Sequence, residues 1–195
     1  MLARAFADDP IYRWLLPDAR AWPGRVERLF AALAEEFEAT GAVLTVRLRG
    51  AALWLPPDPR PRPWLDALLG SLEIGWLFGR HAGRAAALGR ALASARPAER
   101  HGYLAVLGTD PAHRGEGVAS RLLGRVTARC DAAAVPVYLE TAHPRNPAFY
   151  ARHGFAVRET LALPGGAPPV WTLWRPARAR SQAPPAAEAR TSAAT

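Results

Sequence analysis

The strongest constraint on the fold is one continuous segment in the second half of the chain, Tyr103–Ser120 (YLAVLGTDPAHRGEGVAS). Its apolar run Tyr103–Leu107 predicts a buried strand, and Pro111 then takes the chain off the strand ladder because proline has no backbone N–H to donate. A glycine-containing loop leads into a helix predicted over Val118–Ala134, and a second strand is predicted over Val135–Thr141. A strand–helix–strand unit of this length predicts an α/β sheet.

The loop before that helix has the composition of an anion-binding site. The first backbone N–H groups of a helix have no partner within the helix and lie at the positive end of its dipole, so a phosphate can accept from them. Gly115 and Gly117 let a ligand approach the backbone, and Ala119 is the next smallest choice. Taken alone, such a loop fits phosphate binding and a plain connection equally well.

Two other phosphate motifs fit this loop poorly. A Walker-type loop ends in Gly-Lys-Ser/Thr, and the chain contains no lysine. The dinucleotide fingerprint needs a third small residue three positions after Gly117, which Ser120 supplies only loosely. It also needs an acidic residue at the end of a strand about twenty positions later, and only Glu140 offers itself.

The other segments complete one domain over residues 1–175. An apolar stripe starts at Leu2 and stops at Asp9-Pro10, and Trp14, Leu15 and Leu16 form a short apolar knot. The remaining elements are predicted as a helix over Pro23–Ala39, a hairpin over Val43–Leu48 and Ala51–Leu55, helices within Trp64–Ala95, a short helix over Pro147–His153, and strands over Phe155–Leu163 and Val170–Trp174. Residues 176–195 contain no aromatic or branched aliphatic side chain and predict a disordered tail.

The composition of the chain indicates which classes of partner to expect. The net charge of +8 suggests nucleic acid at first, but all 25 basic residues are arginines, 42 positions are alanine, and the arginines are scattered along the chain. We therefore expect no nucleic-acid partner. The single cysteine, Cys130, excludes an intramolecular disulfide and a cysteine-based metal cluster and suits a reducing cytoplasm. No apolar run reaches the ~18 residues of a membrane span, so no membrane partner is expected.

A second segment, Val137–Phe155 (VYLETAHPRNPAFYARHGF), strengthens the prediction that the loop binds a phosphate. The pattern Arg114-x-x-Gly117-x-Ala119, followed by a strand, by Asn146 and by Phe149-Tyr150-x-x-x-Gly154-Phe155, resembles the acetyl-CoA-binding half of the GNAT N-acetyltransferase superfamily. Within this superfamily, the puromycin N-acetyltransferase type is the one that the short segments AFADDP, LWLPP, LET, PRN and FY resemble. The resemblance covers roughly Ala3 to Trp174.

The resemblance implies the GNAT fold, an α/β (α+β) arrangement in which a mixed, mostly antiparallel sheet is flanked by helices. The superfamily normally begins with a strand before the first helix, yet Met1 already lies at the head of that helix. Either the start of the chain is assigned too late, or the sheet lacks its first strand.

The implied reaction is transfer of the acetyl group of acetyl-CoA, a cosubstrate, to a primary amine of a small molecule by direct attack on the thioester, without a metal. The resemblance assigns the following residues to acetyl-CoA: Leu107, Gly108, Thr109, Arg114, Gly115, Glu116, Gly117, Val118, Ala119, Ser120, Asn146 and Tyr150. Gly108 suits a β-bulge that would separate its strand from Val137–Thr141 and open a slot, and a backbone amide there could serve the oxyanion.

Two residues are the candidate catalysts. The phenol of Tyr150, with a reference pKa of ~10, is matched to a leaving alkyl thiol and is the candidate acid; alternatively it packs the short helix on the sheet. Glu140 is the candidate base, or an ordinary carboxylate paired with an arginine. Lesser candidates for the base are Glu36, Glu38 and His143. Three tryptophans either line the acceptor pocket or belong to the core: Trp14, Trp54 and Trp76.

Two alternatives remain open at this point. One is a regulatory domain that binds acetyl-CoA without turnover, and the other is an acetyltransferase for protein or peptide amines. Expected in either case are a cytoplasmic location and a monomer or homodimer, and the sequence does not identify the acceptor.

Overall fold

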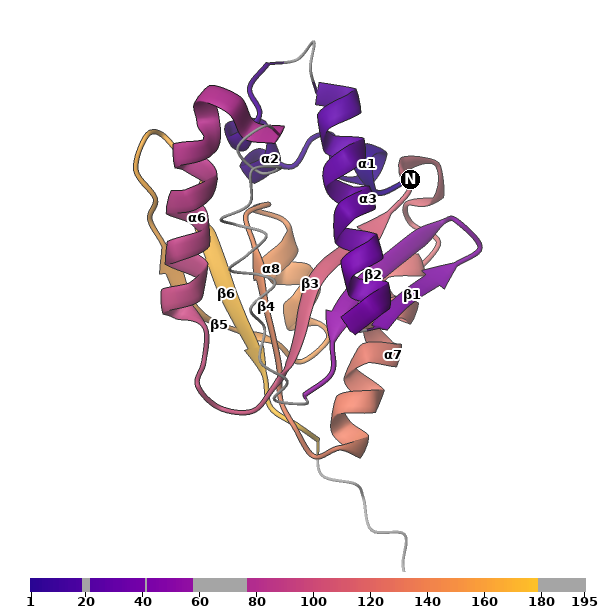
Figure 1. Cartoon of the computed structure of the whole chain (residues 1–195). Coiled ribbons are helices and arrows are strands. Elements are labelled where there is room, and N and C mark those ends of the chain that lie inside the picture. The colour runs from indigo at the N-terminus through magenta and orange to yellow at the C-terminus, as the bar shows by residue number, and fades with distance from the viewer. Residues whose placement is uncertain (19–21, 41, 58–76, 179–195) are drawn as a thin grey trace, which may run out of the picture.

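A computed structural model of the chain describes residues 1–18, 22–40, 42–57 and 77–178. They form a six-stranded sheet in the order β1-β2-β3-β4-β6-β5, with helices on both faces (Figure 1). None of the described helices is both long enough and apolar enough to cross a membrane.

The first part of the chain folds into three helices and a hairpin: α1 (Leu2–Ala5), α2 (Pro10–Leu15), α3 (Trp22–Thr40), β1 (Ala42–Val46) and β2 (Gly50–Leu55). Helix α3 and the hairpin confirm the predicted elements. Helix α2 is not predicted from the sequence, where its end is only a short apolar cluster. Asp9 caps this helix, accepting from the backbone N–H of Ile11 at 3.0 Å, and Pro10 occupies the first helical position, where no N–H is needed.

The second part supplies the rest of the sheet: η1 (Gly79–His81), α6 (Ala82–Ala95), β3 (Gly102–Thr109), η2 (Pro111–His113), α7 (Val118–Ala132), β4 (Val137–Thr141), α8 (Asn146–Ala151), β5 (Ala156–Leu161) and β6 (Val170–Arg175). The predicted strands of this part, the helices α7 and α8, and the end of the helical stretch predicted over Trp64–Ala95 are confirmed to within a few residues at their ends. Residues 58–76 lie outside the described part, as do residues 179–195 of the predicted tail.

Among the strands of the described residues, only β3 and β4 pair in parallel, and the other four strand pairs are antiparallel. The predicted mixed, mostly antiparallel sheet is therefore correct. No strand precedes α1 within the described residues, and β1 forms one edge of the sheet. The other edge is β5, which pairs with β6 alone.

Each face of the sheet has its own hydrophobic core. On one face, α1, α2, α3 and α6 pack against the inward side chains of β2 and β3 in one core cluster, which includes Val26, Phe37 and Leu53. On the other face, α7 and α8 pack against the alternate residues, with Leu122 and Val126 fully buried. Adjacent strand residues point to opposite faces, so this division decides on which face each side chain lies.

The β-bulge in β3 is not at Gly108, where the sequence analysis expected it. Leu104 pairs with Trp54 and Val106 with Leu53, which leaves Ala105 as the extra residue. Gly108 has a different reason to be glycine. A Cβ there would lie 2.7 Å from Cδ2 of Leu2 and 3.0 Å from Cε2 of Phe6, so the glycine lets α1 pack directly on the strand.

Candidate active site

Strands β3 and β4 separate part-way along their length. They pair through three residues each, ending at Leu104 opposite Leu139. Beyond that point β4 continues to pair with β6, Glu140 opposite Thr172, but no longer with β3. One edge of β3 after Leu104 therefore has no strand beside it among the described residues. The separation that the sequence analysis predicted is present, and the bulge at Ala105 directly follows the last pair.

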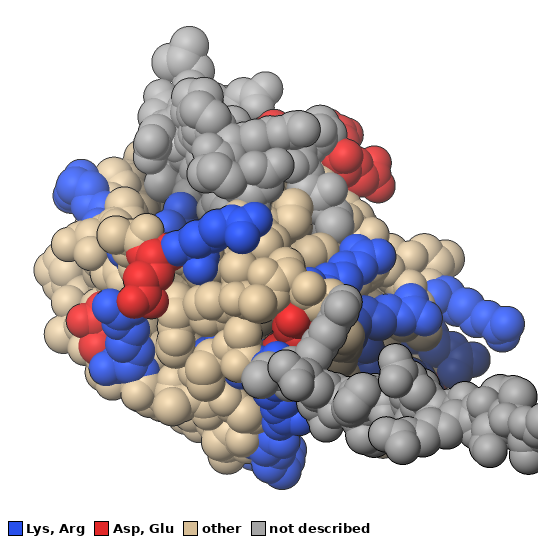
Figure 2. Space-filling view, turned by 90° about the horizontal axis from the view of Figure 1, so that it is seen from below, with Lys and Arg blue, Asp and Glu red and all other residues tan. Residues whose placement is uncertain are grey.

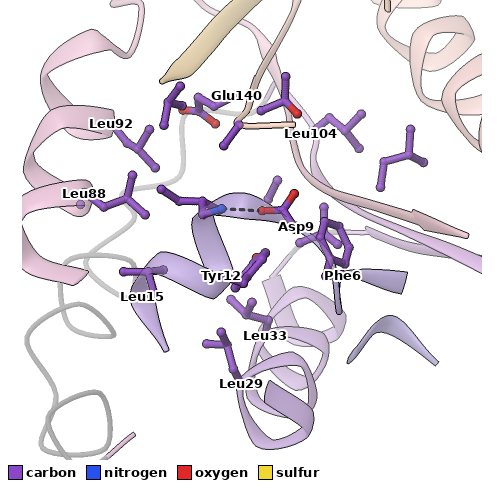
Figure 3. Close-up of a pocket in the computed structure, with 18 of the residues that line it drawn as sticks. Phe6, Asp9, Tyr12, Leu15, Leu29, Leu33, Leu88, Leu92, Leu104 and Glu140 are labelled. Carbon is purple, nitrogen blue, oxygen red and sulfur yellow. Dashed lines mark hydrogen bonds between the residues drawn. The ribbon is translucent and has the colours of Figure 1, made fainter. Parts of the chain in front are cut away.

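A cavity of about 260 Å³ opens at this separation and extends between the helices on the α3 and α6 face. Four of the predicted site residues line it: Leu107, Glu140, Asn146 and Tyr150. Figure 3 shows Glu140 on one side of the space and Asp9 across it, with Leu88 and Leu92 of α6 forming one flank. The structure thus brings the end of β3, the end of β4 and the start of α8 to one space.

Glu140 is partly buried, and its Oε1 atom is fully buried without a hydrogen-bond partner. Burial removes water from the carboxylate and raises its pKa to about 7. The positive charge of Arg96 and the nearby phenols of Tyr103 and Tyr138 oppose that rise. Among the described residues no arginine or histidine forms a direct ion pair with Glu140, and the alternative of an ordinary carboxylate paired with an arginine is met only by the nearby charge of Arg96. At neutral pH this carboxyl group exists in both protonation states.

The side chains next to Glu140 form a compact aromatic and cationic group. The rings of Tyr103 and Tyr138 stack with their centroids 6.1 Å apart, and the guanidinium carbon of Arg96 lies 4.6 Å from the centroid of Tyr103. The Nε atom of Arg96 is buried and has no hydrogen-bond partner. Arg96 caps the C-terminus of α6 and lines the cavity. Its charge lies close enough to Glu140 to lower the pKa of that carboxyl group, without a direct ion pair.

Tyr150 is buried on α8 and lines the cavity. Its ring packs edge-on against Phe149 and Phe155, with centroids 5.2 and 5.6 Å away. Burial and the negative charge of Asp9 raise the pKa of its phenol. The ring therefore packs the short helix on the sheet, as the simpler interpretation had it, while the residue also borders the cavity in its protonated form.

Asn146 begins α8 and donates from its side-chain nitrogen to Oγ1 of Thr141 at 2.7 Å. This bond joins the start of α8 to the end of β4, so both are held at the cavity wall.

The predicted phosphate loop has an open backbone. Gly115 and Gly117 have φ angles of 86° and 72°, in the left-handed region that favours glycine, and no atom lies within 4 Å of a Cβ placed at either position. Gly117 is the N-cap of α7, and no side chain caps that 15-residue helix. Val118 points into the core and is 1% exposed, so only its backbone faces the loop. The first-turn N–H groups of α7 therefore lie beside open space.

The polar residues of this loop bind other parts of the protein. Arg114 donates through Nη2 to the carbonyl oxygen of Ala5 at 3.1 Å. Glu116 accepts from Arg49 at 3.1 Å and lies 3.0 Å from Nδ1 of His113, and these contacts, the one to His113 foremost, lower the pKa of its carboxyl group. These contacts attach the loop to α1 and to the β1–β2 turn.

The chain also matches known proteins. The sequence profile of the acetyltransferase (GNAT) family matches residues 26–155. The chain belongs to the GNAT acetyltransferase family. A solved structure described as "histone acetyltransferase HPA2 and related acetyltransferase" from Corynebacterium glutamicum is 26% identical, with a TM-score of 0.67 over 92% of this chain and 89% of that one. The structure of arylalkylamine N-acetyltransferase 2 from Aedes aegypti has the same fold, with 12% identity and a TM-score of 0.60 over 91% of each chain.

GNAT enzymes take the acetyl group from an acyl-CoA, and the loop fits the pyrophosphate of that cosubstrate. The open space at Gly115 and Gly117 is space that a Cβ would fill, and the uncapped helix start supplies donors for an anion. The unpaired edge of β3 at Leu107–Thr109 suits an extended, amide-containing arm such as pantetheine.

Asp9, Tyr12 and Arg96 line the cavity of this GNAT protein and were not among the site residues named from the sequence. The Asp9-Pro10 pair is a helix-start signal that was available in the sequence, but it indicates a cap and not a cavity position. Nothing local in the sequence distinguishes Arg96 from the other arginines.

Several weaker candidates lie elsewhere. Among the described residues that line the cavity, Glu36, Glu38 and His143 are absent. Trp54 is buried on the α7 face, and Trp14 donates to the carbonyl oxygen of Gly165 at 2.9 Å, so both belong to the core. Trp76 lies outside the described residues.

The structure also shows where the single cysteine and the arginines lie. Cys130 is buried on α7, and burial raises the pKa of its thiol to about 11, as expected of a core cysteine. On the face shown in Figure 2, the arginines stand in several separate groups, some beside carboxylates.

Proposed function

We propose that this GNAT protein transfers the acetyl group of acetyl-CoA to a primary amine of a small molecule. One observation carries the proposal: a single cavity joins the β3–β4 separation, where a thioester arm would enter, to Glu140 and Tyr150. These residues are a carboxyl group with a pKa of about 7 and a buried, protonated phenol. Amine acetylation needs a proton acceptor and a proton donor at the same place.

Acetyl-CoA would be held by groups that the fold already exposes. The backbone N–H groups of Gly115–Ser120 would bind its pyrophosphate, supported by the dipole of α7. The free edge of β3 at Leu107–Thr109 would bind the pantetheine arm, with Asn146 at the opposite wall. When bound, acetyl-CoA supplies an activated acetyl group as a thioester.

Glu140 would act as the general base. A primary amine resembling a lysine side chain has a pKa near ~10 and is almost entirely protonated at neutral pH, so it must lose a proton before it can attack. A carboxylate with a pKa of about 7 is ionised often enough at pH 7–8 to accept that proton, directly or through water. Arg96 and the phenols of Tyr103 and Tyr138 lower the pKa of Glu140 and so oppose the rise that burial causes.

Tyr150 would act as the general acid. Bond formation between the amine nitrogen and the acetyl carbon breaks the carbon–sulfur bond, and the sulfur leaves as a thiolate that needs a proton. The phenol of Tyr150 keeps its proton at neutral pH because burial and Asp9 raise its pKa. It is therefore suited to donate once a strongly basic sulfur develops next to it.

The test is release of free CoA thiol by the purified protein with a panel of amines: aminoglycosides, aminonucleosides, polyamines and peptides, beside simple alkyl and aryl amines. Thiol release that requires both an amine and Glu140 supports the proposal. The requirement for Glu140 is measured with Glu140→Gln, and its matched control is Glu159→Gln, on the exposed strand β5. Tight binding of acetyl-CoA with no thiol release for any amine would contradict the proposal and favour an acetyl-CoA-sensing domain. Turnover confined to peptides would instead favour the peptide acetyltransferase.

A further inference from the structure

The wall that helices α3 and α6 contribute to the cavity is made mainly of apolar side chains. Four leucines of these two helices line the cavity: Leu29 and Leu33 of α3, and Leu88 and Leu92 of α6. Figure 3 shows them around the space below and beside Glu140. A wall of this kind offers no hydrogen bonds to a hydroxyl or amide group of a ligand.

Aromatic rings contribute to the lining of the same cavity. Phe6 and Phe30 stack with centroids 5.1 Å apart, and Tyr12 lies 5.4 Å from Phe6 and 5.3 Å from Phe30. Phe6 and Tyr12 line the cavity. Clustered aromatic side chains present a surface on which another ring or branched aliphatic group packs well.

Two carboxyl groups face this apolar space. Asp9 lies at the start of α2 and Glu140 at the end of β4 (Figure 3). Within the described part of the chain neither forms an ion pair, and burial raises the pKa of each. The buried Oε1 atom of Glu140 has no donor. Asp9 accepts from the backbone N–H of Ile11, and the charge of Arg96 and the phenols of Tyr103 and Tyr138 act on Glu140, but neither carboxyl group has a cation in direct ion-pair contact among the described residues, so a ligand amine could supply one.

We propose that the acceptor is a primary amine attached to an apolar body, an aromatic or branched aliphatic group, with its nitrogen between Asp9 and Glu140 and its body between α3 and α6. The inference rests on the proposed function and names the class of acceptor for the same site. A polyhydroxylated amine would bury hydroxyl groups against the leucines, and each unpaired hydroxyl lowers affinity by about 10-fold or more.

The first experiment compares kcat/KM for 2-phenylethylamine, 2-aminoethanol and an aminoglycoside at saturating acetyl-CoA. We expect 2-phenylethylamine to exceed 2-aminoethanol by at least ~10-fold, and by ~100-fold if its ring is fully buried. A preference for 2-aminoethanol or the aminoglycoside would overturn this inference while leaving the proposed function intact. Turnover of none of the three, nor of any amine in the wider panel, would overturn the proposed function and this inference with it.

The second experiment changes each end of the cavity. Leu88→Gln should reduce the preference for 2-phenylethylamine over 2-aminoethanol, whereas Leu48→Gln, at a leucine that is 81% exposed, should leave it unchanged. Asp9→Asn keeps a good helix cap and removes the charge, so KM for the amine should rise by ~10-fold with KM for acetyl-CoA unchanged. Its control is Asp8→Asn, at an exposed neighbour. Melting temperatures establish that each variant is folded; folded Leu88→Gln and Asp9→Asn proteins with wild-type amine kinetics would contradict the inference.

Discussion

Leu104 and Leu139 are the last residues that pair between β3 and β4. The next residue of β4, Glu140, still pairs with Thr172 of β6, so its backbone is fixed while its side chain faces the cavity. The bulge at Ala105 begins where this pairing ends. The parting of two strands therefore determines both where a thioester arm could enter and where a carboxyl group is available.

Replacement of Tyr150 by phenylalanine tests the proposed acid. The ring packing against Phe149 and Phe155 should survive, since only the hydroxyl is lost. We expect kcat to fall by ~10²-fold or more, with little change in KM for acetyl-CoA. Phe149→Leu thins the packing on the same helix but keeps the hydroxyl, and should retain most of kcat. Equal turnover by Tyr150→Phe and wild type would show that Tyr150 has only a structural role.

Removal of the charge at Arg96 should shift the pH profile. Arg96 lowers the pKa of Glu140, so Arg96→Met should raise that pKa and move the rise in kcat/KM to higher pH. Arg90→Met, at an exposed position of the same helix, is the matched control. A profile for Arg96→Met that superimposes on the wild type, or moves to lower pH, would contradict the assignment of Glu140 as the titrating group.

The glycine loop gives a prediction on acetyl-CoA binding. Gly117→Ala places a Cβ in the open space and forces alanine into a left-handed conformation, which costs about 1–2 kcal/mol. Acetyl-CoA affinity, measured by calorimetry, should fall by ~10-fold or more. Gly124→Ala, in the middle of α7 with free space around it, should leave affinity unchanged and stabilise the helix by about 0.5–1 kcal/mol. Unchanged affinity in Gly117→Ala would argue against this loop as the pyrophosphate site.

Burial of Glu140 also predicts how stability depends on pH. Its pKa is raised on folding, so the folded protein favours the protonated carboxyl, and stability falls as pH rises from about 4.5 to about 7. Glu140→Gln removes the ionised form. Its melting temperature should exceed that of the wild type by a few degrees at pH 8, and the difference should vanish near pH 4. A difference that does not change with pH, as expected for Glu159→Gln on exposed β5, would show that Glu140 is not buried as described.

The sequence predicts the parts of this site whose signals are local. The strand, the proline at position 111 and the glycines of the loop determine conformation within a few residues of themselves, and the structure has them as expected. Tyr150 could be named because it stands at a recognisable position of a family pattern, and Glu140 because it lies on the second predicted strand near the expected separation. Asp9 and Arg96 could not, since they reach the cavity only through the packing of α2 and α6 on the sheet.

The position of the β-bulge in β3 also could not be predicted from local sequence. Gly108 is suited to a bulge, yet its lack of a side chain is needed by Leu2 and Phe6, more than 100 positions earlier in the chain. Ala105, which carries the bulge, has nothing in its identity that indicates one. Trp54 could equally have pointed to either face until the strand register was known, and the register buries it against α7.

The role of Glu140 as the base is tested most directly by the pH dependence of kcat/KM for amine acetylation in the wild type and in Glu140→Gln. In the wild type we expect activity to rise with an apparent pKa of about 7, well separated from the ionisation of the amine at ~10. In Glu140→Gln this rise should disappear, and kcat/KM at pH 8 should be ~10²-fold lower with acetyl-CoA affinity retained. Wild-type activity and an unchanged pH profile in Glu140→Gln would contradict the assignment.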